Sequence, residues 1–143
     1  MTIRLVIADD HAQFRAYLAD LLGRQPALSV VAQAADGRCL MQVLAQLPAA
    51  VFPHVLVVDV EMRDAGGVEA TRQSLASYPQ LRMVALSMHD DPAFVAAMLA
   101  AGAHGYVLKD DPLTELVRAI HEVAAGRLCF SKSIAAAMRP PAA

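Results

Sequence analysis

Short apolar runs alternate with helical patterns along this chain. The runs cover residues 3–8, 29–34, 55–58, 83–87 and 105–108, and aliphatic residues dominate them. Between the runs, apolar positions recur every three or four residues, which is the spacing of an amphipathic helix. This alternation indicates five βα units, because strands joined by crossover helices pair in parallel.

The alternation predicts an α/β fold in which five helices cover both faces of a five-stranded parallel sheet. Right-handed crossovers leave few topologies open. The doubly wound, flavodoxin-like strand order 2-1-3-4-5 is the simplest of them. A length of 143 residues suits one hydrophobic core and is too short for two ordinary domains.

Proline and glycine mark the ends of the last predicted helices. Asp91-Pro92 and Asp111-Pro112 each offer an N-cap followed by proline at the first helical position, so the fourth and fifth helices should begin there. Gly126 suits the C-terminal cap of the fifth helix.

Residues beyond Gly126 form a C-terminal extension. Ser131 could cap a short helical segment through Met138, and the prolines at positions 140 and 141 cannot continue a helix easily. We therefore assign residues 1–126 to the domain and residues 127–143 to an extension that begins a linker.

Composition excludes several classes of protein. The chain is 57% hydrophobic with a mean hydropathy of +0.41, yet no apolar run approaches the roughly 18–20 residues of a spanning helix. The first residues lack the pattern of a secretory signal. A net charge of −2 offers no basic face for nucleic acid. Cys39 and Cys129 fit no redox or zinc motif. These features predict a cytoplasmic protein without membrane contact.

Three carboxylates stand at the ends of two predicted strands. Asp9 and Asp10 follow the first strand, and Asp59 ends the third. Because loops at the carboxyl edge of such a sheet lie side by side, these side chains should converge. A proton or a cation must then offset their repulsion, and oxygen ligands suit Mg²⁺. Taken singly, Asp10 could instead cap a helix and Asp59 could merely terminate a strand.

Two further polar residues should reach the same edge. Ser87 ends the fourth strand and Lys109 follows the fifth. A lysine ammonium lowers the repulsion among carboxylates and can hold a phosphoryl oxygen, to which a serine hydroxyl can also donate. Either residue alone could be a solvated charge or a turn former.

Five motifs, in order and at consistent spacing, cover nearly the whole chain. With them the sequence resembles the receiver domain of two-component response regulators, in the NarL/FixJ (LuxR-type) branch, which has a CheY-like fold. The motifs are residues 7–11 (IADDH), 57–62 (VVDVEM), 67–72 (GVEATR), 86–91 (LSMHDD) and 101–110 (AGAHGYVLKD).

The resemblance implies a metal site and a phosphorylation site. Asp59 would accept a phosphoryl group from a sensor histidine kinase or a small acyl phosphate. Mg²⁺ (or Mn²⁺) would bind Asp10 directly, Asp9 largely through water, Asp59, and the backbone carbonyl of Glu61. Further implied phosphoryl-binding and switch residues are Ser87, Lys109 and Tyr106.

The implied mechanism depends on charge. A carboxylate with an unperturbed pKa of about 3.9 is already ionised at neutral pH, so Asp59 would need no general base. After phosphorylation, Ser87 would move toward the new oxygens and Tyr106 would turn inward. A half-buried ring that closes the sheet edge is the alternative for Tyr106.

The acceptor loop departs from the pattern of most relatives. Arg63 and Gly66 stand where relatives have proline and an acid, so the loop should be more mobile than usual. Glu61 and His89 occupy two variable positions that flank the phosphoryl site and influence its lifetime in this family.

The resemblance further implies a switch rather than an enzyme with external turnover. Its output would be transcription, through a helix-turn-helix DNA-binding domain that is missing from this chain, and a homodimer is possible. A receiver-like interaction module independent of phosphorylation is the alternative. A haloacid-dehalogenase-type hydrolase is disfavoured because residues 8–12 lack its DxDxT pattern, and nucleotide-binding glycines are missing after the first strand.

Overall fold

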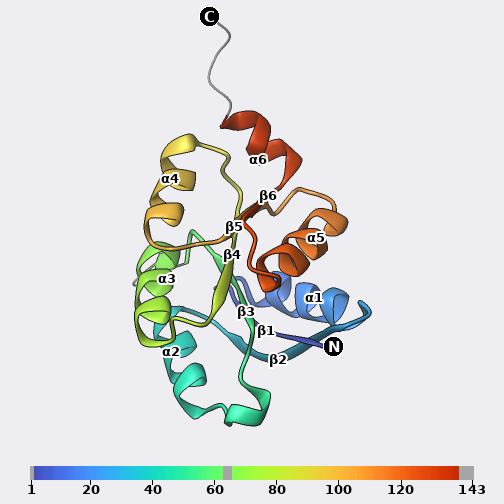
Figure 1. Cartoon of the computed structure of the whole chain (residues 1–143), viewed down its shortest axis with the longest axis vertical. Coiled ribbons are helices and arrows are strands. Elements are labelled where there is room, and N and C mark those ends of the chain that lie inside the picture. The colour runs from blue at the N-terminus through green and yellow to red at the C-terminus, as the bar shows by residue number, and fades with distance from the viewer. Residues whose placement is uncertain (1, 63–65, 139–143) are drawn as a thin grey trace, which may run out of the picture.

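The computed structural model describes residues 2–62 and 66–138, and within them one parallel sheet forms the centre of the molecule (Figure 1). Its strand order is β2-β1-β3-β4-β5-β6, so the predicted order of the first five strands is confirmed. The strands are β1 (Ile3–Ala8), β2 (Leu28–Ala34), β3 (Val55–Asp59), β4 (Arg82–Ser87), β5 (Gly105–Leu108) and β6 (Cys129–Phe130).

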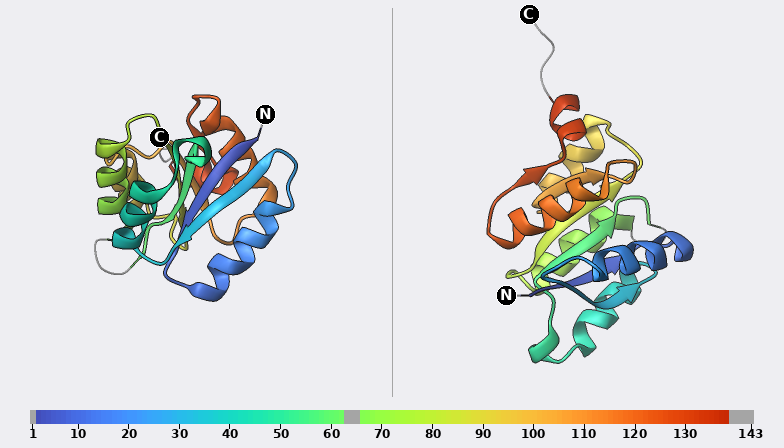
Figure 2. Two further views of the ribbon diagram at one scale, coloured as in Figure 1. Left: turned by 90° about the horizontal axis from the view of Figure 1, so that it is seen from below. Right: turned by 90° about the vertical axis from the view of Figure 1, so that its right-hand side faces the viewer.

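Helices cover both faces of the sheet (Figure 2). On one face lie α1 (Ala12–Gly23) and α5 (Leu113–Ala124); on the other lie α2 (Gly37–Gln46), α3 (Gly66–Ser77) and α4 (Pro92–Ala100). A short 3-10 turn, η1 (Ala49–Val51), precedes β3, and α6 (Lys132–Ala137) follows β6. Across the described ranges, no helix has both the length and the apolar character to cross a membrane.

The central strands divide the core into two layers. In β1, Leu5 and Ile7 face α1 and α5, whereas Val6 and Ala8 face α2, α3 and α4. Every residue of β3 is buried, as expected for a parallel strand covered on both faces. Each fully buried aliphatic side chain contributes about 1.5–3 kcal/mol. This packing fixes the carboxyl ends of β1 and β3 beside each other.

The predicted count of five strands and five helices was incomplete. β6 pairs with β5 through Gly105–Cys129 and Tyr106–Phe130. A strand of two residues is too short for hydrophobic periodicity to signal it. The expected helix after Ser131 is confirmed, since the Ser131 hydroxyl accepts a hydrogen bond from the Ile134 N–H, and Ile134 is fully buried. β6 therefore extends the sheet, and α6 packs against β5.

The two predicted Asp-Pro starts differ in the structure. Asp91 caps α4 as expected, with its carboxylate accepting from the Ala93 N–H at 2.8 Å. Asp111 was wrongly predicted as a cap, because α5 begins at Leu113 after Pro112. Instead, the Asp111 carboxylate accepts from the Leu108 N–H and the Ser133 hydroxyl, each at 2.8 Å. Contacts with the extension thus replace the local cap.

Candidate functional site

Carboxylates from the ends of β1 and β3 converge at one edge of the sheet, as predicted. Asp9 and Asp59 are each 1% exposed, and Asp10 is partly buried. One ligand atom from each of Asp9, Asp10, His11 and Asp59 lies within 4.8 Å of the others. His11, which ends the first motif, was not predicted from the sequence to lie among the candidate metal ligands.

Asp9 is held by groups on both sides. Its Oδ1 accepts the His11 N–H at 2.8 Å, and its Oδ2 lies 3.0 Å from Lys109 Nζ. Its backbone carbonyl accepts a hydrogen bond from Arg15 Nη1 at 2.7 Å. Asp9 is therefore a fixed, ion-paired carboxylate between β1 and the segment after β5.

Lys109 is the cation that the described residues place among these acids. Its Nζ lies 3.0 Å from Asp9 Oδ2 and 3.4 Å from Asp59 Oδ2, and its side chain is 8% exposed. Burial alone would lower its pKa, but the pairing with Asp9 and Asp59 outweighs burial and raises the pKa. The ammonium also lies 4.8 Å from the centre of the Phe14 ring, a cation–π contact that sequence reasoning missed.

Asp59, the last residue of β3, has two carboxylate oxygens in different surroundings. Its Oδ1 accepts the Glu61 N–H at 3.0 Å, while its buried Oδ2 accepts no hydrogen bond from the described residues. Burial, followed by the neighbouring Glu61 carboxylate, raises the pKa of Asp59 to about 7. The assumption of an unperturbed carboxylate was therefore wrong, because sequence does not reveal the loss of hydration. An additional positive charge beside Asp59 would favour its ionised form.

The donor set suits a hard divalent cation. Asp9, Asp10 and Asp59 offer carboxylate oxygens, and Asp59 Oδ2 is a buried acceptor with no hydrogen-bond donor from the described residues. Oxygen ligands of this kind are those of Mg²⁺. The His11 imidazole is a poor ligand for such an ion, and its side chain is 68% exposed, with Nδ1 3.4 Å from both Asp9 and Asp10.

Ser87 lies at the end of β4, fully buried. Its hydroxyl donates to Glu61 Oε1 at 2.6 Å and accepts the His89 N–H at 2.9 Å. The same Glu61 oxygen accepts the Met88 N–H at 3.2 Å. This role of the Glu61 side chain was missed, because the sequence argument used only its backbone carbonyl and its flanking position.

Tyr106, on β5, is not the half-buried ring of the alternative expectation. Its side chain is fully buried, and its hydroxyl donates to the His89 carbonyl at 3.0 Å. The His89 ring stacks on Phe94 with centroids 5.1 Å apart. Ser87, Tyr106 and His89 thus form one hydrogen-bonded unit at the start of the β4–α4 connection.

The acceptor loop is only partly described. Arg63, the first departure from the family pattern, lies outside the described residues, whereas Gly66 has a positive φ of 70° and opens α3. A Cβ on the next residue, Gly67, would lie 2.4 Å from the Asp59 carbonyl oxygen. The start of α3 therefore packs tightly on the backbone that carries Asp59.

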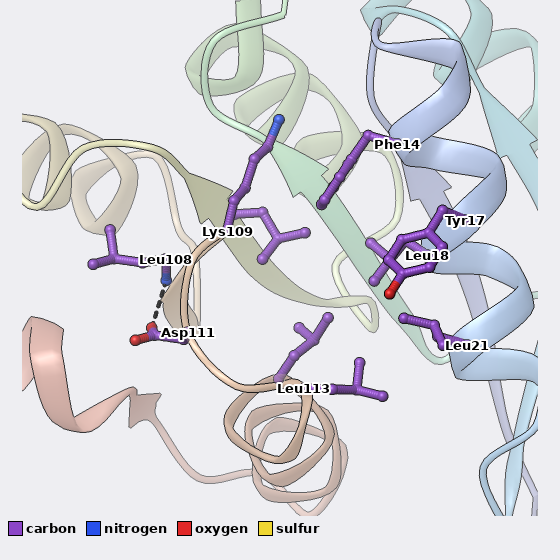
Figure 3. Close-up of a pocket in the computed structure, with 10 residues that line it drawn as sticks. Phe14, Tyr17, Leu18, Leu21, Leu108, Lys109, Asp111 and Leu113 are labelled. Carbon is purple, nitrogen blue, oxygen red and sulfur yellow. Dashed lines mark hydrogen bonds between the residues drawn. The ribbon is translucent and has the colours of Figure 1, made fainter.

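A small apolar cavity of about 210 Å³ lies beside the site, between α1 and α5 (Figure 3). Lys109 and Phe14 both line it, and the Lys109 ammonium reaches from there to Asp9 and Asp59. Leucines from both helices and from β4 and β5 complete most of its wall. The cavity keeps the lysine stem in an apolar environment while its charge stays at the sheet edge.

Comparison with known proteins identifies relatives of the whole fold. A transcriptional regulatory protein, DegU of Brevibacillus brevis, is 36% identical over 87% of this chain and 51% of its own length. The DNA-binding transcriptional activator DevR/DosR of Mycobacterium tuberculosis is 40% identical over 95% of this chain and 61% of its own length. This chain therefore spans about half to three-fifths of these relatives.

Solved structures agree. A two-component response regulator of the LuxR family from an Aurantimonas species superposes with a TM-score of 0.89 and 34% identity, covering 96% of each chain. A family model for the response regulator receiver domain matches residues 5–121. With the strand order and the acidic edge described above, these matches show that the chain belongs to the response regulator receiver domain family, among relatives of the LuxR type.

Proposed function

We propose that this domain is a phosphorylation switch whose acceptor is Asp59. The observation that carries the proposal is the position of Asp59: a buried carboxylate, 1% exposed, whose Oδ2 accepts no hydrogen bond from the described residues and forms an ion pair with Lys109 Nζ at 3.4 Å. The nucleophile, a fixed cation and a group of oxygen ligands therefore meet at one point. The donor would be the phosphohistidine of a sensor kinase or a small acyl phosphate.

Mg²⁺, or Mn²⁺, is the proposed cofactor, held by Asp9, Asp10, Asp59 and the Glu61 carbonyl. When bound, the ion supplies positive charge that favours the ionised acceptor and the anionic phosphoryl group. In the transfer, an oxygen of Asp59 forms a bond to phosphorus as the bond to the donor nitrogen or oxygen breaks. The electron pair of the broken bond leaves with the donor.

The protein's own groups orient this transfer. Lys109, fixed by Asp9 and the Phe14 ring, would hold one phosphoryl oxygen by a charge-assisted hydrogen bond. The Ser87 hydroxyl would donate to another. Because Ser87 and Tyr106 both contact His89, a change at Ser87 would alter the β4–α4 surface, which is a shift between two packings.

The wider protein is proposed from its relatives. A transcriptional output through a DNA-binding domain beyond the residues of this chain accords with the names of DegU and DevR/DosR. A related structure contains RcsB dimers bound to DNA, so a homodimer is also proposed. We also propose that the protein is cytoplasmic. Residues 1–126 would form the receiver domain, and residues 127–143 a C-terminal extension that begins a linker. No turnover of an external substrate is expected.

The test is intact mass after incubation with acetyl phosphate, with and without Mg²⁺. We expect a Mg²⁺-dependent gain of one phosphoryl group that disappears in Asp59→Asn. The matched control is Asp20→Asn, because Asp20 is an exposed acid on α1. Label that persists in Asp59→Asn would reject the acceptor assignment. A folded protein that is never labelled would favour an interaction module independent of phosphorylation.

A further inference from the structure

The Glu61 side chain lies between the acceptor and the β4–α4 connection. Its Oε1 accepts two hydrogen bonds, from the Ser87 hydroxyl at 2.6 Å and from the Met88 N–H at 3.2 Å. His89 Nε2 lies 3.5 Å from the same oxygen. Three groups, from the last residue of β4 and the two residues after it, therefore surround one carboxylate oxygen that comes from the loop after β3.

The Ser87 hydroxyl has no proton left for a further hydrogen bond. A serine hydroxyl has one proton to donate, and Ser87 gives it to Glu61 while the hydroxyl oxygen accepts the His89 N–H. A phosphoryl oxygen on Asp59 that binds Ser87 needs that same proton. Glu61 and the phosphoryl group cannot both receive it.

We propose that the Glu61 carboxylate is an internal competitor for the phosphoryl-binding hydroxyl: it holds Ser87 and the adjacent Met88 N–H until the phosphoryl group replaces it. This inference rests on the proposed function, because it assumes phosphorylation of Asp59. It makes Glu61 a positioning residue that acts through Ser87. Phosphorylation then exchanges one anion for another at the start of the β4–α4 connection.

Two physical consequences follow. While Glu61 holds the single proton of the Ser87 hydroxyl, an incoming phosphoryl group lacks that donor, so Glu61 should slow labelling. The two hydrogen bonds to Oε1 also hold the Met88 and His89 backbone near Ser87, and Tyr106 is fixed to the His89 carbonyl. Removing the carboxylate should therefore speed labelling and loosen this segment before any label is added.

The experiment compares the full chain with Glu61→Ala and Glu61→Gln. Amide hydrogen exchange of Met88 and His89 is measured first without a phosphoryl donor, and the rate of labelling by acetyl phosphate with Mg²⁺ is measured second. In Glu61→Ala we expect exchange and labelling to rise, each on the order of tenfold. Glu61→Gln keeps an oxygen acceptor that binds the Ser87 hydroxyl more weakly than a carboxylate does, so its amide exchange and labelling rate should lie between those of the native chain and Glu61→Ala.

Glu69→Ala is the control, because it removes an acid of α3 whose carboxylate binds Arg72 and Gln73 instead. It should change neither quantity. Compared with Ser87→Ala alone, the double variant with Glu61→Ala and Ser87→Ala should gain little in labelling rate, since the competition acts through that hydroxyl. A purely structural role for Glu61 would not depend on Ser87 in this way.

The outcomes separate the two proposals. If the native chain is labelled and Glu61→Ala shows the same labelling rate and the same amide protection, the competition is rejected and the switch stands. If no chain is labelled, the proposed function fails and the competition fails with it. Faster labelling that persists unchanged without Ser87 would also overturn the competition.

Discussion

The carboxyl ends and the amino ends of the strands, here called the carboxyl edge and the amino edge of the sheet, use ionisable side chains in opposite ways. At the carboxyl edge, Asp9, Asp59 and Lys109 are buried with charges that only partly balance. At the amino edge, two histidines act as neutral acceptors: His54 Nδ1 accepts the Arg4 N–H at 2.9 Å, and His104 Nδ1 accepts the Met83 N–H at 3.1 Å.

The amino edge is complete by itself. The backbone N–H of each histidine also donates to a backbone carbonyl, that of Arg4 for His54 and that of Met83 for His104, at 2.9 Å in both cases. Burial, and then the nearby Arg4 or Arg82, lowers the pKa of His54 and His104 respectively. At the other edge, burial and the Glu61 carboxylate raise the pKa of Asp59. One edge thus closes the sheet, and the other keeps an unsatisfied negative site for ligands.

Removal of Lys109 should break this arrangement most strongly. Lys109→Met leaves Asp9 and Asp59 buried without their cation, so we expect a loss of about 3–5 kcal/mol in the free energy of unfolding and loss of detectable labelling. The chain's other lysine provides the control, since Lys132 is exposed on α6. Chemical denaturation and intact mass give the two readouts. A Lys109→Met chain as stable as Lys132→Met would contradict the idea of unbalanced buried charge.

Gly67 tests how closely the carboxyl edge is packed. In Gly67→Ala the new Cβ would lie 2.4 Å from the Asp59 carbonyl oxygen, so the backbone must shift, and we expect a loss of about 2–4 kcal/mol. Gly23→Ala, where no atom lies within 4 Å of the new Cβ, should be neutral or slightly stabilising. Equal stability of the two variants by urea denaturation would reject this close contact.

The sequence predicted the framework well because periodicity and strand ends carry that information. The five main strands, their order and the convergence of Asp9, Asp10, Asp59 and Lys109 all follow from it. β6 was missed because two residues show no period, and Asp111 was misassigned because its carboxylate turns back to the Leu108 N–H and binds Ser133, which only the fold brings near.

The site's electrostatics and side-chain contacts could not be predicted in the same way. The raised pKa of Asp59 comes from burial, which depends on the packing of several elements at once. The bond from Ser87 to Glu61 joins residues 26 positions apart, and its direction depends on a rotamer rather than on spacing. Sequence therefore located the residues but not their charges or donors.

Mg²⁺ should stabilise the protein through the carboxyl edge alone. Binding only to the folded form adds about 2.7 kcal/mol to the free energy of unfolding at 100 times the dissociation constant. Thermal unfolding with increasing Mg²⁺ measures it. Asp10→Asn should lose most of this gain, whereas Asp20→Asn should retain it, because Asp20 is exposed on α1, away from the acidic group. A gain of equal size in both variants would place the ion elsewhere.

The two edges should respond to pH with opposite signs. His54 and His104 have lowered pKa values in the fold, so their contribution is complete above the unfolded pKa of about 6.5 and is lost as pH falls below it. Asp59 has a raised pKa of about 7, so its contribution is complete below its unfolded pKa of about 3.9 and is lost as pH rises through 7.

Variants can separate the two contributions to the pH dependence of stability, measured in metal-free protein between pH 5 and pH 7. Asp59→Asn should expose the histidine contribution, so its stability falls with acid more steeply than that of the native chain. His54→Gln combined with His104→Gln keeps neutral acceptors that do not titrate, and its stability should fall less with acid, or rise. The difference between the two variants should be about 2 kcal/mol over this range, because protonation of Asp59 near its raised pKa of about 7 changes the stability by about 1.4 kcal/mol per pH unit. Parallel pH profiles in urea denaturation would show that the two edges do not differ in this way.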